Sequence, residues 1–189
     1  MKLKDWIPIS ISVVALGFSV FIWWSAQNEA ERTREREYLV DFLRPLKSIL
    51  YITRDMHQSL LSDTNLKKLE YAPDYVHREL HKDMKPDDPR RVLWRVEIAR
   101  LMNENEKAVE LVERHIGRVE NTELRNLLEK FKMHALDWQE MWRAILNPDP
   151  ELVSGYTGRD RLKTDPFPAG LDELLDSEIA RVEALIGLE

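Results

Sequence analysis

The chain has 189 residues, no cysteine, a formal net charge of −6 and 33% charged residues. The absence of cysteine excludes disulfides, thiolate metal sites and cysteine nucleophiles. The mildly acidic balance argues against general nucleic-acid binding, which requires a basic excess. Once an apolar N-terminal stretch is set aside, the remaining length fits one domain with a core of its own.

The N-terminal stretch is Trp6–Ala26, and no charged residue falls between Asp5 and Glu29. A helix of this length matches a hydrocarbon core of about 30 Å. Trp6 stands at one end and a Trp-Trp pair at the other, where aromatic rings favour the lipid headgroup level. The pattern predicts one transmembrane helix.

A cleavable signal peptide is the alternative interpretation of this stretch. The apolar run is longer than a usual signal core, and Trp23 and Trp24 occupy positions where small residues should prepare cleavage. An uncleaved anchor is therefore favoured. We predict an anchor over residues 1–27 and a soluble domain over residues 28–189, with a long Pro- and Gly-containing loop at 147–170.

The basic residues on either side of the stretch predict its orientation. Lys2 and Lys4 precede it, and a larger basic set follows it: Arg32, Arg34, Arg36, Arg44 and Lys47. Since basic flanks stay on the cytoplasmic side, we expect a single-pass protein of the cell inner membrane whose soluble domain faces the cytoplasm. A periplasmic domain is the alternative, because Lys2 and Lys4 also resist translocation.

Small side chains line one face of the predicted anchor, at i, i+3, i+7 and i+14: Ser12, Ala15, Ser19 and Ala26. Such faces let membrane helices approach closely. The sequence therefore predicts a homo-oligomer with this face as its interface. The alternative is that Ser and Ala are simply common in membrane helices.

The charged segment after the anchor contains no Pro or Gly, so we expect the helix to continue into solvent. An apolar line at alternating three- and four-residue steps follows: Leu39, Phe42, Leu46, Ile49, Thr53, Met56 and Leu60. Pro45 interrupts this line and should kink the helix near Asp41, because proline removes a backbone donor.

Three further apolar lines predict three more helices. The first is Trp94, Ile98, Leu101, Asn105, Ala108, Val112, His115 and Val119, with polar residues at Asn105 and His115. The second is Leu124, Leu128, Phe131, Ala135, Trp138, Trp142 and Ile145, and the third is Leu171, Leu175, Ile179, Val182 and Ile186. No alternating run predicts a strand. The fold class is therefore all-α: one N-terminal transmembrane helix that continues into an antiparallel bundle of about four helices, with coiled-coil-like packing.

Three groups of residues are candidates for chemistry. Glu70, Asp74, His77 and His81 share one face of an unbroken helix and predict a metal site. Arg90, Arg91 and Arg95 at a helix start, and Arg159, Arg161 and Lys163 after a Gly-containing loop, are candidates for an anion or cofactor site. A solvated charged surface is the alternative in each case.

Enzyme motifs are missing from the sequence: it has no Gly-x-Ser-x-Gly elbow and no phosphate-binding fingerprint. We predict no cofactor, and partners that are the lipid membrane, the protein itself and another protein. The first hypothesis is a single-pass, self-associating interaction module that acts as an accessory or effector protein. The alternative is a membrane-tethered nucleotide-binding protein or metal-dependent hydrolase.

The layout of one anchor and one helical domain resembles that of small one-pass accessory and effector proteins of bacterial antiviral systems, including membrane proteins of CRISPR loci. The likeness covers the arrangement alone and involves no motif residue. It implies, as an expectation, an effector whose anchors assemble into an oligomeric pore.

Overall fold

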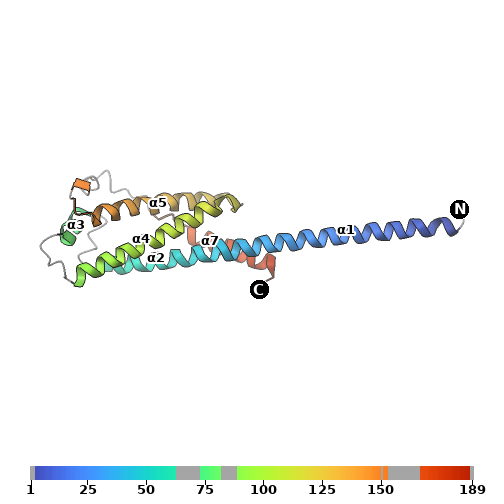
Figure 1. Cartoon of the computed structure of the whole chain (residues 1–189), viewed down its shortest axis with the longest axis horizontal. Coiled ribbons are helices and arrows are strands. Elements are labelled where there is room, and N and C mark those ends of the chain that lie inside the picture. The colour runs from blue at the N-terminus through green and yellow to red at the C-terminus, as the bar shows by residue number, and fades with distance from the viewer. Residues whose placement is uncertain (1–2, 63–72, 82–88, 150, 153–166, 188–189) are drawn as a thin grey trace.

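The computed structural model describes residues 3–62, 73–81, 89–149, 151–152 and 167–187. Every regular element among these residues is helical, which confirms the all-α prediction. The longest feature is a rod made of three consecutive elements: α1 (Leu3–Tyr38), the π-helical turn η1 (Leu39–Leu43) and α2 (Arg44–Ser62). Figure 1 shows that its N-terminal part projects far beyond the other helices.

The π-helical turn lies where the sequence predicts a kink. Pro45 has no N–H to donate to the carbonyl of Asp41, so the regular ladder is interrupted there. The backbone N–H of Arg44 instead donates to the carbonyl of Leu39, five residues earlier. The turn thus contains one extra residue, which accommodates the hydrogen bond that Pro45 cannot make, and the rod stays continuous.

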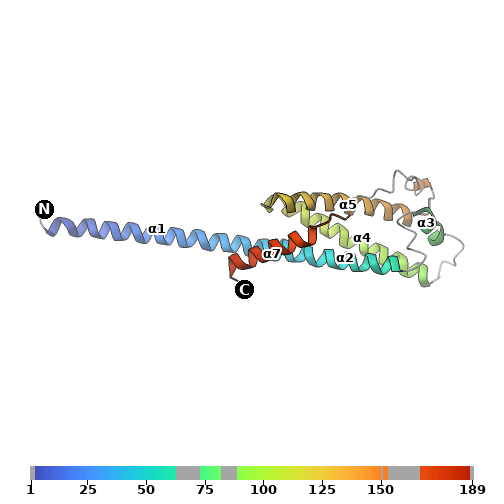
Figure 2. The same ribbon diagram turned by 180° about the vertical axis from the view of Figure 1, so that it is seen from behind.

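The bundle forms around the second half of the rod (Figures 1 and 2). Helix α4 (Pro89–His115) returns along α2, and α5 (Thr122–Leu146) runs back along α4 after the short 3₁₀ turn η3 (Ile116–Arg118). Helix α7 (Leu171–Ile186) lies against the rod where α1 meets α2, and α3 (Pro73–His81) packs on the far end of α5. The antiparallel arrangement agrees with the predicted bundle.

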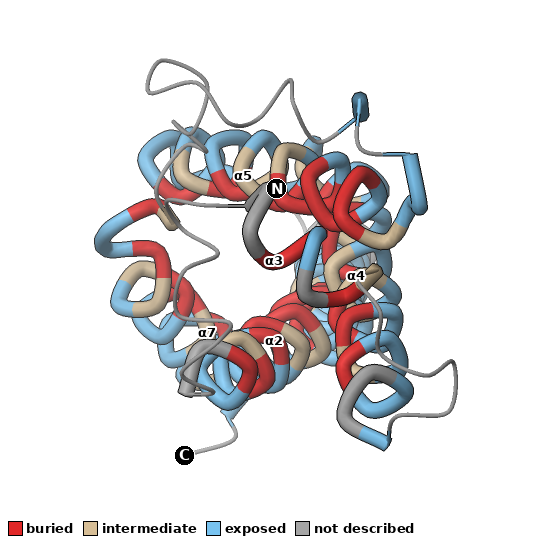
Figure 3. Tube along the Cα trace, turned by 90° about the vertical axis from the view of Figure 1, so that its left-hand side faces the viewer, coloured by how far each residue is buried: buried red, intermediate tan, exposed pale blue. Residues whose placement is uncertain are grey.

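The predicted apolar lines face inward, as the end view in Figure 3 shows. One buried cluster joins the rod to α4, α5 and α7, with Leu39, Phe42 and Leu128 among its fully buried members. A second cluster at the far end contains the three tryptophans Trp94, Trp138 and Trp142. These three tryptophans are therefore core residues.

Helix ends are defined by local chemistry. Asn121 caps α5, because its side-chain oxygen accepts hydrogen bonds from the backbone N–H groups of Glu123 and Leu124. Asn147 ends the same helix just before a proline. Gly187, at φ 75°, ends α7 in the left-handed conformation that glycine adopts without strain.

The predicted transmembrane span is not supported by the structure. Among the residues that the structure describes, no helix is long and apolar enough to cross a membrane. Side chains of α1 are described from Ala15 onward, so the first part of the span, residues 6–14, lies outside the described side chains. The division into residues 1–27 and 28–189 stays a prediction, and α1 crosses that boundary without a break.

Candidate functional site: the projecting helix and its junction with the bundle

Large apolar side chains cover the projecting part of α1. Each is more than half exposed, and they follow one another closely: Leu16, Phe18, Val20, Phe21, Ile22, Trp23 and Trp24. Figure 1 shows this part of the rod standing clear of the bundle. Monomeric soluble proteins rarely expose contiguous apolar surface of this kind. This exposed apolar surface is therefore the most unusual feature of the described residues.

The small face of α1 shares this exposure. Ala15, Ser19 and Ala26 are exposed, while the side chain of Ser12 lies outside the described set. The hydroxyl of Ser19 donates to the carbonyl of Ala15 at 2.9 Å, so its polarity is satisfied inside the helix. The face thus offers little except small side chains, and its role as an interface stays a prediction.

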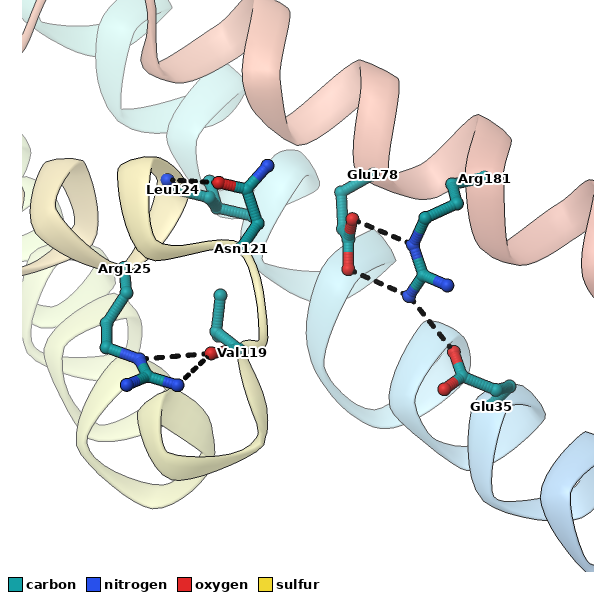
Figure 4. Close-up of polar contacts among 7 residues, drawn as sticks. All are labelled: Glu35, Val119, Asn121, Leu124, Arg125, Glu178 and Arg181. Atoms are coloured by element: carbon teal, nitrogen blue, oxygen red, sulfur yellow. Dashed lines mark hydrogen bonds and ion pairs between the residues drawn. The ribbon is translucent and has the colours of Figure 1, made fainter.

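An ion-pair network connects α7 to the rod at the base of the projection: Arg181, which is exposed, pairs with the buried Glu178 on α7 and with Glu35 on the rod (Figure 4). Glu178 is only 4% exposed, and both of its carboxylate oxygens accept hydrogen bonds from the Arg181 guanidinium at 3.0 Å. Arg181 also reaches Glu35 of α1 at 3.4 Å. This fork-shaped pairing provides the charge compensation that a buried carboxylate requires.

Tyr38 lies beside this ion pair at the end of α1. Its ring is buried, and its hydroxyl has no hydrogen-bond partner among the described residues. Burial, and next the nearby Glu178 carboxylate, raise the pKa of Tyr38 well above its usual value. Arg118 lies over the Tyr38 ring at 5.5 Å and donates to the carbonyl of Arg34 at 2.8 Å. The junction therefore ties α1, η3 and α7 together.

Three exposed ion pairs extend the contact along α2. Arg44 pairs with Glu183 at 2.7 Å, Arg54 pairs with Asp172 at 2.5 Å, and Lys47 pairs with Asp176. Exposed pairs contribute about 0–1 kcal/mol each. The order of the three pairs along the two helices fits only an antiparallel placement of α7. Their contribution to the free energy of folding is small.

The two histidines of the predicted metal site contact backbone carbonyls at the end of α5. The Nε2 atom of His77 lies 2.8 Å from the carbonyl oxygen of Asn147, and that of His81 lies 2.9 Å from the carbonyl of Ile145. A carbonyl oxygen can only accept, so each Nε2 carries the proton and cannot bind a metal. These contacts satisfy carbonyls that a helix end leaves without partners.

The other residues of that prediction are only partly described. Glu70 lies outside the described residues, and Asp74 belongs to α3 but its side chain is not described. Within the described part of the chain, no group of three or more His, Asp or Glu side chains is placed to hold a metal ion. The metal site therefore gains no support from the geometry.

The predicted anion sites are equally incomplete. Arg90 and Arg91 lie in the first turn of α4 with side chains outside the described set, and Arg95 is exposed. The second set, Arg159, Arg161 and Lys163, lies outside the described residues. Among the residues that the structure describes, neither set forms a site, and both stay predictions.

The environment of His115 predicts that the free energy of unfolding depends on pH. Its ring stacks on Phe42 with centroids 5.2 Å apart. Burial, followed by Arg118 and Arg114, lowers the pKa of His115 from its usual 6.5, against a smaller opposing effect of Asp41. The unfolded chain therefore takes up this proton first, and stability should fall as the pH drops below about 6.5.

We expect the urea midpoint of the full chain to decrease between pH 7.5 and pH 5.5, and the decrease to be smaller in His115→Leu. Denaturation of both proteins at the two pH values, followed by circular dichroism, measures the difference. An equal decrease in both proteins would show that His115 does not contribute to it.

Sequence reasoning missed Glu178 and Tyr38 as buried polar residues. A charged residue on a helix is usually expected to face solvent, so the apolar line predicted for α7 runs through Ile179 and not through Glu178. The available signal was spacing: Glu178 lies three residues after Leu175 and four before Val182, which places it on the inward line. A charged residue at this spacing from two apolar residues is the signal that identifies Glu178 as buried.

Comparisons with protein-family models, with curated proteins and with solved structures find no match to this chain.

Proposed function

We propose that this protein is a single-pass, membrane-anchored helical interaction module that associates with itself through its N-terminal helix. The exposed run of apolar side chains from Leu16 to Trp24, on a helix that stands clear of the bundle, carries the proposal. In the sequence, the uncharged stretch Trp6–Ala26 has the length that a helix needs to cross a hydrocarbon core. A bilayer is the environment in which such a surface is stable.

The proposed module has its bundle in the cytoplasm of the cell, below the inner membrane. The basic residues that follow the apolar stretch, among them Arg32, Arg34 and Arg36, are exposed on the rod and favour the cytoplasmic side. A protein partner docks on the bundle, and the anchor localises the complex. In its effector form, several anchors assemble into a pore.

Anchoring is tested by alkaline carbonate extraction of membranes that contain the full chain. We expect the wild type to stay in the membrane pellet. Leu16→Arg combined with Val20→Arg should shift the protein to the extract, because each central arginine costs about 2.5–3.5 kcal/mol of insertion free energy. Ser48→Arg, an exposed position on α2, is the control and should stay in the pellet. Extraction of the wild type would contradict the anchor.

Self-association is tested by crosslinking in membranes. Ser12→Leu with Ser19→Leu should prevent close approach of the small faces while leaving the helix apolar. We expect the crosslinked fraction to fall about tenfold at limiting concentration, corresponding to a loss of about 1–2 kcal/mol. Ser10→Leu with Gly17→Leu is the matched control, since both positions lie two residues away, on the opposite side of the helix. Equal crosslinking of the two variants would exclude the small face.

A further inference from the structure

From Ala26 through the π-helical turn η1, the rod is buried against the bundle on one side only. One line faces the bundle: Asn28 and Glu35 are half-buried, and Leu39 and Phe42 are fully buried. The other line is exposed throughout and steps by four and three residues: Ala26, Ala30, Thr33, Glu37 and Val40. Four of its five members lie two residues before a member of the first line, a little over half a turn away. Arg32, two residues after Ala30, is exposed and lines a groove beside Leu185. The exposed line is therefore the side that the bundle leaves open.

We propose that a second copy of this chain packs in parallel along this exposed line, from Ala26 to Val40. The inference rests on the proposed anchor, because helices anchored in one membrane with the same orientation meet in parallel. The spacing of the line is that of a two-stranded coiled coil. Val40 is 52% exposed beside the core, and the second copy covers it.

Charge complementarity identifies the second copy as the partner. Glu29 and Arg36 flank the line on one side, and Arg34 and Asp41 flank it on the other; all four are exposed. In a parallel pair, a flanking residue meets the opposite flank five positions later on the partner helix. Glu29 then faces Arg34, and Arg36 faces Asp41. Both contacts join opposite charges, and two-fold symmetry repeats each of them.

Two features define where the pairing is weakest and where it ends. Glu37 is the charged member of the line, and two copies of it approach each other in a parallel pair, with the partner's Arg36 alongside. The π-helical turn Leu39–Leu43 inserts an extra residue, which rotates the following positions away from the line. The paired segment therefore ends at the bundle, and the two bundles diverge beyond it.

The absence of native cysteine allows a test by single-cysteine crosslinking of the full chain in membranes. Thr33→Cys lies on the proposed line and should form an intermolecular disulfide, which requires Cα atoms within about 7 Å. Arg32→Cys is the matched control: it is the neighbouring exposed position, but it faces the groove beside Leu185. We expect Thr33→Cys to crosslink at least tenfold faster than Arg32→Cys. Equal rates would overturn the proposal.

Charge reversal tests the register. In the Thr33→Cys background, Glu29→Arg should reduce crosslinking severalfold, because the new arginine faces Arg34 of the second copy. Adding Arg34→Glu should restore it by recreating the opposite pair. Glu37→Leu should increase crosslinking, since it replaces two facing carboxylates with apolar contact. If the second reversal fails to restore crosslinking, the parallel register is wrong.

Ser19→Cys separates this inference from the proposed function. If Ser19→Cys crosslinks in the anchor and Thr33→Cys does not, the anchors associate while the rods diverge, and the further inference alone is overturned. If neither variant crosslinks and the wild type is a monomer, self-association itself is overturned together with it. Crosslinking of both variants with a silent Arg32→Cys supports the pairing along the whole rod.

Discussion

Trp142→Ala should destabilise the bundle by about 3–5 kcal/mol, the range for truncating a fully buried large aromatic. Trp142 is 1% exposed and packs against Trp138 with ring centroids 6.0 Å apart. Both rings belong to the far cluster that joins α2, α3, α4 and α5. Removing the indole therefore leaves a cavity that helices held from several sides cannot close. Urea denaturation followed by circular dichroism measures the loss.

Met133→Ala is the matched control for that experiment, because Met133 lies on the same helix and is 51% exposed. Its change should stay within about 0.5 kcal/mol. A loss below about 1 kcal/mol in Trp142→Ala would mean that the far cluster is loosely packed and that its tryptophans are available to a ligand.

Arg181→Met should cost about 2–3 kcal/mol, a large effect for one surface-facing residue. The substitution keeps the apolar stem and removes the charge, so Glu178 remains buried without its partner. The Glu178 side chain is 5% exposed, and an uncompensated carboxylate at that depth is strongly unfavourable. Its pairing with Arg181 raises the pKa of the Arg181 guanidinium, which shows the same coupling from the other side. Urea denaturation at pH 7.5 measures the effect.

A second substitution separates charge burial from packing. Glu178→Leu added to Arg181→Met should recover most of the lost stability, because a buried pair replaced by apolar side chains is often neutral. Lys47→Met removes an exposed ion pair with Asp176 of α7 and should cost less than about 1 kcal/mol. If Arg181→Met costs no more than Lys47→Met, the junction does not depend on the buried charge.

The junction matters for function because it sets how the rod leaves the bundle. Arg181 and Arg118 bind α1 from two different elements, at Glu35 and at the carbonyl of Arg34. The rod is thereby held from two sides just before the π-helical turn. In the proposed module, a partner on the bundle and a second copy on the rod are connected through this rigid point.

Much of the fold was predictable because a helix that is buried on one side has apolar residues at regular intervals in its sequence. Six of the seven residues in the predicted Leu39–Leu60 line are buried, with Ile49 half-buried, and every residue of the Leu124–Ile145 line is buried. Pro45 indicated the irregularity near Asp41, since the loss of a backbone donor is a local property. Only its form, a π-helical turn instead of a simple kink, was missing.

The candidate chemistry was less predictable because side-chain partners come from distant parts of the chain. His77 and His81 have the spacing of metal ligands, yet both rings bond to carbonyls of α5, about 64 to 70 residues away. The predicted transmembrane span is a further case in which pattern and structure differ, since the described residues contain no helix able to cross a membrane.

The sequence by itself determined the helical class, the irregularity near Asp41 and most of the inward lines, because each depends on residues a few positions apart. The tertiary structure alone decided which polar groups are buried together. Glu178, Tyr38 and Arg118 come from three elements, and only the packing of α7 and η3 against the rod places them side by side. Electrostatic neighbours are a property of distance in space, which local periodicity does not encode. The same packing decided which face of the rod stays open.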